Sequence, residues 1–170
     1  MAVHDVTPVE HRILSVLVEN RSGVLSHVVG LFSARGFNIA SLAVGETEDP
    51  TMSRITLVAE GDQKTLEQIK KQLNKLIDVI KVQDLTEEED IDRELMLVKM
   101  RNASPFKEAL KTLMTQYRIQ VVDENPKVIT FECTETRENT KKLFEQFKQA
   151  GIIEIAQTGA VALSKKAPKD

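Results

Sequence analysis

Apolar residues follow two different periods along the first part of the chain. Residues 12–19 hold a dense run of Ile, Leu and Val, which favours a short central strand. After the polar segment 20–23, apolar residues recur at three- and four-residue steps, as on one buried face of a helix. That predicted face consists of Val24, Leu25, Val28, Val29, Leu31 and Phe32. Gly36 can take the left-handed conformation that ends a helix, and residues 37–44 then predict a second strand.

The pattern continues with a strand, a helix and a further strand. Residues 53–60 alternate between apolar and polar positions, which indicates a strand. Asp62 is a suitable N-cap for a helix whose apolar positions are Leu66, Ile69, Leu73 and Leu76. Residues 79–85 predict a fourth strand. The resulting order, βαββαβ, is that of one ferredoxin-like unit.

The second half of the chain repeats this order without evident sequence identity to the first half. Residues 94–101 predict a strand, and Ser104 and Pro105 fit the N-cap and first position of a helix. Residues 119–123 and 128–133 predict a hairpin, and a helix capped by Thr136 precedes one last strand over residues 152–163. We therefore predict an α+β protein with two consecutive ferredoxin-like βαββαβ domains.

The composition of the connecting segments sets the predicted boundaries. We expect a flexible N-terminus over residues 1–11 and a first domain over residues 12–85. The charged stretch 86–92 offers little to bury and predicts an acidic linker. A second domain then covers residues 93–164, and the lysine-rich residues 165–170 predict a frayed tail.

Overall charge and hydropathy exclude several classes of partner. The net charge is −3, so the chain as a whole does not attract nucleic acid or an anionic membrane. No apolar run approaches the roughly 20 residues needed to cross a bilayer. Cys133 is the only cysteine, so no disulfide can form within the chain. We expect a cytoplasmic protein that binds neither nucleic acid nor membranes.

The residues that catalysis would need do not converge in the sequence. The histidines are His4, His11 and His27, and none stands at metal-ligand spacing from a cysteine or a carboxylate. The acidic run 87–92 lacks the central glycine of a calcium loop, so we interpret it as a solvated linker. The sequence therefore predicts no catalytic residue, no metal site and no cofactor in this chain.

The segment between the first strand and the first helix is the best candidate for a binding site. A helix start exposes unpaired N–H groups, and Gly23 would let a carboxylate approach them. Asn20 could hold both polar groups of an amino acid, while Val24, Leu25 and Ile39 would suit an aliphatic side chain. The alternative is that Asn20, Ser22 and Gly23 only cap the helix.

Two further residues are unusual for their predicted positions. Asn38 stands near the start of the second strand, where its amide needs a partner from a ligand or from the backbone. Gly30 lies inside the first helix, where glycine costs about 1 kcal/mol relative to alanine. We expect something to pack closely against Gly30, within the subunit or across a dimer.

Several long runs of the sequence resemble one protein family. They are residues 12–20 (RILSVLVEN), 22–25 (SGVL), 30–39 (GLFSARGFNI), 53–56 (SRIT), 67–76 (EQIKKQLNKL), 93–99 (RELMLVK) and 155–159 (IAQTG). Together they make the chain similar to the small subunits of acetohydroxyacid (acetolactate) synthase, whose first domain is an ACT domain. The resemblance extends from about Arg12 to Ser164.

This resemblance implies a regulatory function in branched-chain amino acid biosynthesis. Small subunits of that family bind and activate a large catalytic subunit that carries thiamine diphosphate, Mg²⁺ and FAD. They also confer feedback inhibition by valine or a related amino acid bound between the ACT domains of a homodimer. The resemblance implies that Asn20, Gly23, Val24 and Leu25 of one subunit and Asn38 and Ile39 of its partner frame the effector.

Two other functions share the same order of elements. RNA-recognition domains stack bases on aromatic residues of their central strands, whereas residues 12–19 and 53–60 contain no aromatic residue. Small acylphosphatases use the fold for hydrolysis, but their arginine-containing phosphate loop is not visible here. Salt-sensitive RNA retention or turnover of an acyl phosphate would favour these alternatives.

Overall fold

The computed structural model describes residues 10–86 and 90–166. The described chain divides into two compact units, the first comprising residues 10–86, 90, 91 and 162–166, and the second residues 92–161. Each unit is described by itself below. None of the helices in the described part of the chain is long and apolar enough to cross a membrane.

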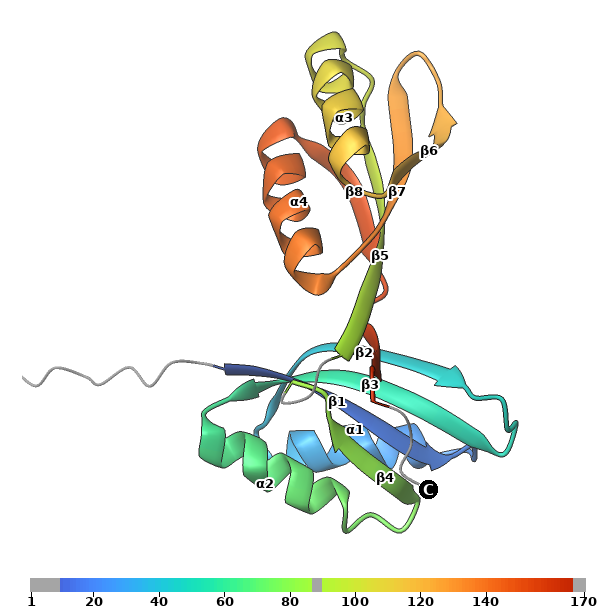
Figure 1. The fold of residues 1–170 in the computed structure, drawn as a ribbon, viewed down its shortest axis with the longest axis vertical. Coiled ribbons are helices and arrows are strands. Elements are labelled where there is room, and N and C mark those ends of the chain that lie inside the picture. Colours follow the sequence, from blue (N-terminus) through green and yellow to red (C-terminus); the bar gives the residue numbers. More distant parts are fainter. Residues whose placement is uncertain (1–9, 87–89, 167–170) are drawn as a thin grey trace, which may run out of the picture. The chain divides into compact units, whose positions relative to one another are not determined.

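The first unit has the predicted βαββαβ order. Its elements are β1 (Glu10–Glu19), α1 (Val24–Arg35), β2 (Asn38–Glu46), β3 (Met52–Gly61), α2 (Gln63–Leu73) and β4 (Val79–Asp84). The strands form an antiparallel sheet in the order β2-β3-β1-β4, with α1 and α2 on one face (Figure 1). β1 and β3 are therefore central, whereas β2 and β4 form the two edges. The predicted fold class is confirmed.

The core of this unit lies between the sheet and its two helices. Alternate residues of β1, among them Leu14 and Val16, are buried against the apolar faces of the helices. The predicted face of α1 is only partly correct, because Leu25 and Val29 are 41% and 39% exposed. These two side chains lie outside the stripe that faces the sheet. An amphipathic period alone could not distinguish the buried from the exposed apolar positions.

The ends of both helices are fixed by local hydrogen bonds. Gly36 is left-handed at φ 67° as the C-cap of α1, as predicted, and its N–H donates to the carbonyl of Ser33. The Asp62 carboxylate caps α2 by accepting the Thr65 N–H at 2.7 Å. Hydrogen bonds from the side chain and the N–H of Thr65 lower the pKa of Asp62. Both helices therefore begin or end where the sequence predicted.

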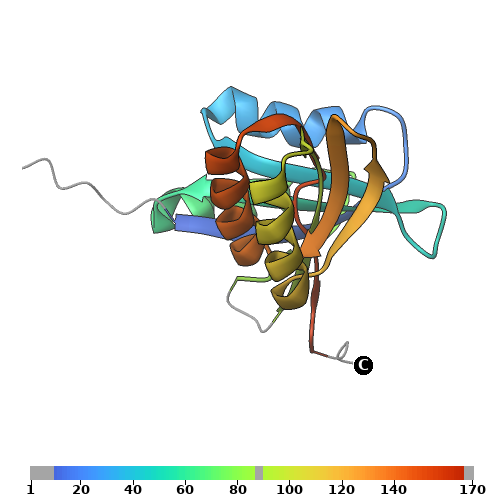
Figure 2. The same cartoon turned by 90° about the horizontal axis from the view of Figure 1, so that it is seen from above.

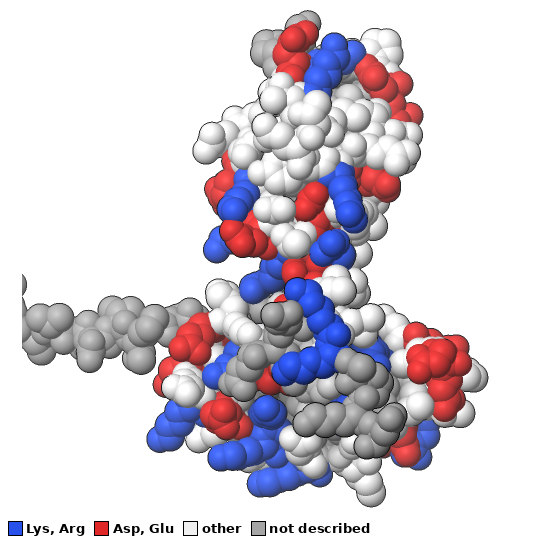
Figure 3. All heavy atoms as spheres, in the orientation of Figure 1, with Lys and Arg blue, Asp and Glu red and all other residues white. Residues whose placement is uncertain are grey.

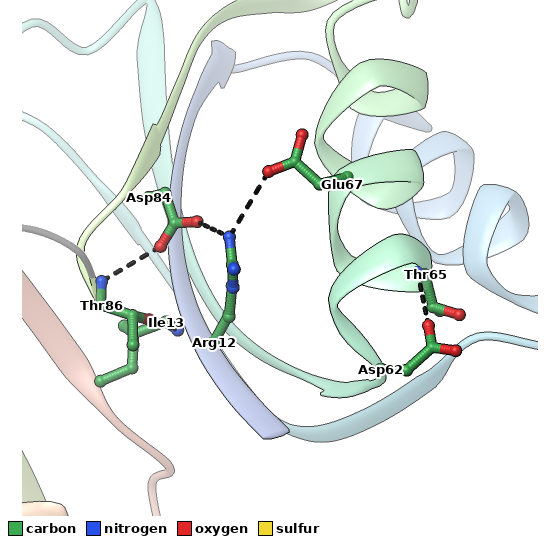
Figure 4. A network of polar contacts seen from close by, with 7 residues as sticks. All are labelled: Arg12, Ile13, Asp62, Thr65, Glu67, Asp84 and Thr86. Atoms are coloured by element: carbon green, nitrogen blue, oxygen red, sulfur yellow. Dashed lines mark hydrogen bonds and ion pairs between the residues drawn. The ribbon is translucent and has the colours of Figure 1, made fainter. Parts of the chain in front are cut away.

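A buried ion pair fixes the end of the first unit's sheet (Figure 4). The Arg12 guanidinium donates to the Asp84 carboxylate at 2.9 Å and lies 3.8 Å from the Glu67 carboxylate of α2. The other oxygen of Asp84 accepts the Thr86 N–H at 3.1 Å, and the Thr86 hydroxyl accepts the Ile13 N–H at 2.7 Å. Because both charged side chains are buried, loss of either would leave the charge of the other less well compensated. The network ties the end of β4 to β1 and α2.

The second unit repeats the topology of the first. Its elements are β5 (Asp90–Arg101), apart from residues 90 and 91, then α3 (Ser104–Gln116), β6 (Ile119–Glu124), β7 (Val128–Glu135), α4 (Arg137–Ala150) and β8 (Ile152–Gln157). The last strand, β9 (Val161–Ser164), lies in the first unit except for Val161. The strand order is β6-β7-β5-β8, with β9 also paired to β5, and α3 and α4 lie side by side (Figures 1 and 2). The fully buried Phe131 contacts the rings of Phe106 and Phe147 at the centre of the core.

The structure differs from the predicted boundaries at several points. The predicted strand 152–163 is two strands, β8 and β9, because the chain leaves the ladder between residues 158 and 160. The N-cap of α3 is Ala103 rather than Ser104, which already has helical backbone. β5 begins at Asp90, inside the predicted acidic linker, and β1 begins at Glu10, inside the predicted flexible terminus. The predictions of a flexible N-terminus, an acidic linker and a frayed tail also concern residues 1–9, 87–89 and 167–170, which lie outside the described residues.

Candidate functional site

The turn between β1 and α1 presents unpaired backbone donors. Gly23 is the N-cap of α1 with φ 89°, a left-handed conformation that an L side chain rarely adopts, and no side chain caps the helix. The N–H groups of Leu25 and Ser26, in the first helical turn, have no hydrogen-bond partner among the described residues. Two free amides at the positive end of a helix dipole suit a carboxylate.

Of the three capping candidates, Gly23 is the N-cap, whereas Asn20 and Ser22 do not cap the helix. The Asn20 side chain instead donates to the carbonyl of Pro50 at 2.9 Å and to the Glu46 carboxylate at 3.2 Å. Its backbone N–H donates to the carbonyl of Thr51 at 2.7 Å. Asn20 therefore fastens the turn to the β2–β3 hairpin, and the backbone amides, rather than its own amide, are left to hold a carboxylate.

A buried carboxylate braces the same turn from the other side. Asp78, between α2 and β4, is 7% exposed and accepts from Arg21 at 3.1 Å, while its second oxygen lies 2.8 Å from Nδ1 of His27. Its carbonyl also accepts the Glu19 N–H at 3.0 Å, and Arg21 contacts the Glu19 carboxylate as well. Asp78 thus connects the end of β1, the turn and the first turn of α1.

Replacing Asp78 by asparagine should loosen this turn. The Asp78→Asn variant keeps the size of the side chain but loses the charge that faces Arg21 and His27. We expect the free energy of unfolding to fall by about 1–2 kcal/mol, because a hydrogen bond to a charged group contributes on the order of 1.5–3 kcal/mol and both partners are exposed. Urea denaturation would measure the change, and an unaltered midpoint would contradict the role of Asp78 as a brace.

The other residues of the predicted site occupy separate places. Asn38, at the start of β2, donates to the Glu60 carboxylate, and Ile39 packs against the core. Val24 is 4% exposed and belongs to the core beneath the turn, whereas Leu25 is exposed. β2 runs for nine residues, about 26 Å, from Asn38 to Glu46, and Glu46 is the end that contacts Asn20. One chain therefore does not bring Asn20 and Asn38 together.

Two residues near the turn were not singled out from the sequence. Glu46 ends β2 two residues beyond the predicted strand, and Asp78 lies in a connection whose sequence resembles any solvated loop. Both act through partners more than 20 positions away, so no local pattern could reveal them.

The rest of the described chain offers little chemistry. No group of three or more His, Cys, Asp or Glu residues suited to a metal ion occurs among residues 10–86 and 90–166. Cys133 is 1% exposed in the second core, and burial raises the pKa of its thiol to about 12. A thiol with that pKa stays protonated at neutral pH and is a poor nucleophile.

Fold and site together define a class of protein that has two ferredoxin-like units and, before its first helix, a turn with free N–H groups that suit an anionic ligand. Sequence comparison defines the family. Residues 14–81 match the AHAS small subunit-like ACT domain, and residues 93–166 match the family described as the small subunit of acetolactate synthase. The chain belongs to the acetolactate synthase small subunit family.

Individual relatives agree with this assignment. The chain is 46% identical to the acetolactate synthase small subunit of Haemophilus influenzae over 155 residues, 91% of this chain and 95% of the relative. It is 44% identical to the acetolactate synthase isozyme 3 small subunit of Escherichia coli, again over 155 residues, 91% of this chain and 95% of the relative. The crystal structure of the Thermotoga maritima small subunit superposes with a TM-score of 0.80 at 36% identity, covering 94% of this chain and 99% of that one.

Proposed function

We propose that this chain activates an acetolactate synthase catalytic subunit and makes it sensitive to valine or a related branched-chain amino acid. The observation that carries the proposal is the open turn at Gly23, where Leu25 and Ser26 present free N–H groups in a chain of this family. The effector's carboxylate binds these amides. The exposed side chains of Leu25 and Val29 on α1 provide apolar surface for an aliphatic side chain nearby.

A homodimer completes the proposed site. β2 is an edge strand, and its residues 38–45 carry no charge, although isolated edges are usually protected by charged residues. Antiparallel pairing of two β2 strands would bring Asn38 of one copy beside the Glu46 end of the other. That arrangement joins Asn20 and Asn38, which lie too far apart within one chain.

Gly30 gives independent support for a partner on this side of the unit. A Cβ atom added at Gly30 would meet no atom within 4 Å, so packing within the subunit does not require glycine there. The residue is exposed on α1 next to Val29, which is also exposed. Close approach of a second copy would account for a helical glycine that otherwise costs about 1 kcal/mol.

The catalytic chemistry belongs to the partner in this proposal. Thiamine diphosphate, Mg²⁺ and FAD bind to the large subunit, and this chain supplies none of their ligands. A cytoplasmic location is also part of the proposal, supported by a single cysteine that cannot form an intrachain disulfide.

Affinity purification of the complete chain from its host, followed by mass spectrometry, tests the proposed partnership. A thiamine-dependent synthase subunit should copurify, and adding the chain to that subunit should raise its activity and make it sensitive to valine. A synthase that neither binds the chain nor changes its activity would contradict the proposal.

A further inference from the structure

In each unit an asparagine directly after the first strand bonds to the end of the second strand and to the hairpin that follows it, an arrangement that we call the asparagine latch. Asn102 follows β5 as Asn20 follows β1, and its side chain donates to the carbonyl of Asn125 at 2.6 Å and to the Glu124 carboxylate at 3.1 Å. Its backbone N–H donates to the carbonyl of Lys127 at 2.9 Å. In both units the latch joins an asparagine to a glutamate that ends the second strand and to the hairpin that follows it.

The helices after the two latches can be aligned by their buried residues. Val24 and Val28 are buried four and eight residues after Asn20, and Phe106 and Leu110 are buried four and eight residues after Asn102. By this alignment Leu25 of α1 corresponds to Lys107 of α3. The same alignment places Gly23, which starts α1, opposite Pro105, which already lies inside α3.

The glutamates of the two latches differ in whether a cation pairs with them. In the second unit the Lys107 ammonium lies 2.5 Å from the Glu124 carboxylate and contributes to the lowered pKa of that group. In the first unit the corresponding helical residue is Leu25, and Glu46 makes no ion pair among the described residues. Carboxylates gather at the end of the first unit where the β2–β3 hairpin lies (Figure 3). In the described part of the first unit, the Glu46 carboxylate thus has no ion-pair partner.

Strand register places Glu46 on the same side of the sheet as α1. Glu46 pairs with Ser53 of β3, which is two residues before the core residue Ile55, so both side chains lie on the helix-covered side. Asn20, which touches Glu46, is also three residues before the N-cap Gly23. An amino acid whose carboxylate binds the α1 amides would therefore have its ammonium close to Glu46.

We propose that Glu46 binds the α-ammonium group of the amino-acid effector, in the position that the Lys107 ammonium takes beside Glu124. The inference rests on the proposed function and adds the residue that selects an amino acid over an anion of the same shape. A 2-oxo acid with the carbon skeleton of valine has the carboxylate but no ammonium. The Glu46 carboxylate attracts the ammonium group of the amino acid, and it repels the 2-oxo acid, which is only an anion.

Calorimetry on the complete chain tests this role with two ligands, L-valine and 2-oxo-3-methylbutanoate. In the Glu46→Gln variant the affinity for valine should fall about 10- to 100-fold, because a hydrogen bond to a charged group contributes about 1.5–3 kcal/mol. The affinity for the oxo acid should stay the same or rise. The matched control is Glu48→Gln, which removes a charge from the same hairpin at an exposed position and should leave both affinities unchanged.

The possible results separate the two proposals. Equal valine binding by Glu46→Gln and the unchanged chain would overturn the role of Glu46 and leave the effector function standing. A parallel loss of both ligands would also overturn it, since it would show that Glu46 only shapes the turn. If the unchanged chain bound no branched-chain amino acid, the proposed effector function itself would fail.

Discussion

The Gly23→Asp variant is expected to lose affinity for valine by about 100-fold or more. Aspartate at the N-cap would place its own carboxylate on the first-turn amides, which then cannot bind the effector's carboxylate. Two hydrogen bonds to a charged group contribute enough for a loss of this size. Calorimetry with L-valine measures the change directly.

A matched control separates this effect from backbone strain. Gly36 is left-handed like Gly23, with φ 67° against 89°, and an added Cβ would meet no atom within 4 Å at either glycine. Gly36→Asp therefore imposes a similar strain at the opposite end of α1, and it should bind valine as the unchanged chain does. Wild-type affinity in Gly23→Asp would show that the effector does not bind at this turn.

A charge on the β2 edge should dissociate the proposed dimer. Val44 is 46% exposed on β2, and in the Val44→Arg variant each of two paired copies would have to bury a guanidinium near the other. We expect the dissociation constant of the dimer to rise about 100-fold or more. Sedimentation equilibrium would measure it, and valine binding should weaken in parallel because the partner's Asn38 is lost from the site.

The opposite edge of the same sheet provides the control for this variant. Ile80 lies on β4 and is 52% exposed, so Ile80→Arg adds the same charge at a similarly exposed position. It should leave self-association unchanged. Equal weakening by both variants would indicate a general effect of charge, and no weakening by either would place the interface elsewhere.

The hydrophobic periods predicted the number, order and type of the main elements because each element carries its own local signal. Gly36, Asp62 and Thr136 mark helix ends through bonds within a few residues, so these boundaries could be predicted. The split between β8 and β9 has no such marker. A continuous apolar stretch does not show where the strand ladder is interrupted.

The sequence predicts where the candidate site lies but not which contacts its residues make. Gly23 and Asn20 were identified because a glycine turn before an amphipathic helix is a local pattern. The partners of Asn20 could not be predicted, since Pro50 and Glu46 reach it only when the hairpin folds beside β1. The same reason explains why Asp78, 51 residues beyond His27, gave no signal in the sequence.

By itself, the sequence determined the two βαββαβ units and the position of a glycine turn before α1, which remains a predicted carboxylate site. Only the tertiary structure decided that Asn20 is a latch rather than a cap. Only the structure decided that Asn20 contacts Glu46, at the end of β2 opposite to Asn38. Only the structure also showed that, among the described residues, no cation pairs with Glu46 as Lys107 pairs with Glu124. Local periodicity fixes elements, whereas contacts between distant residues depend on how the sheet brings strand ends together.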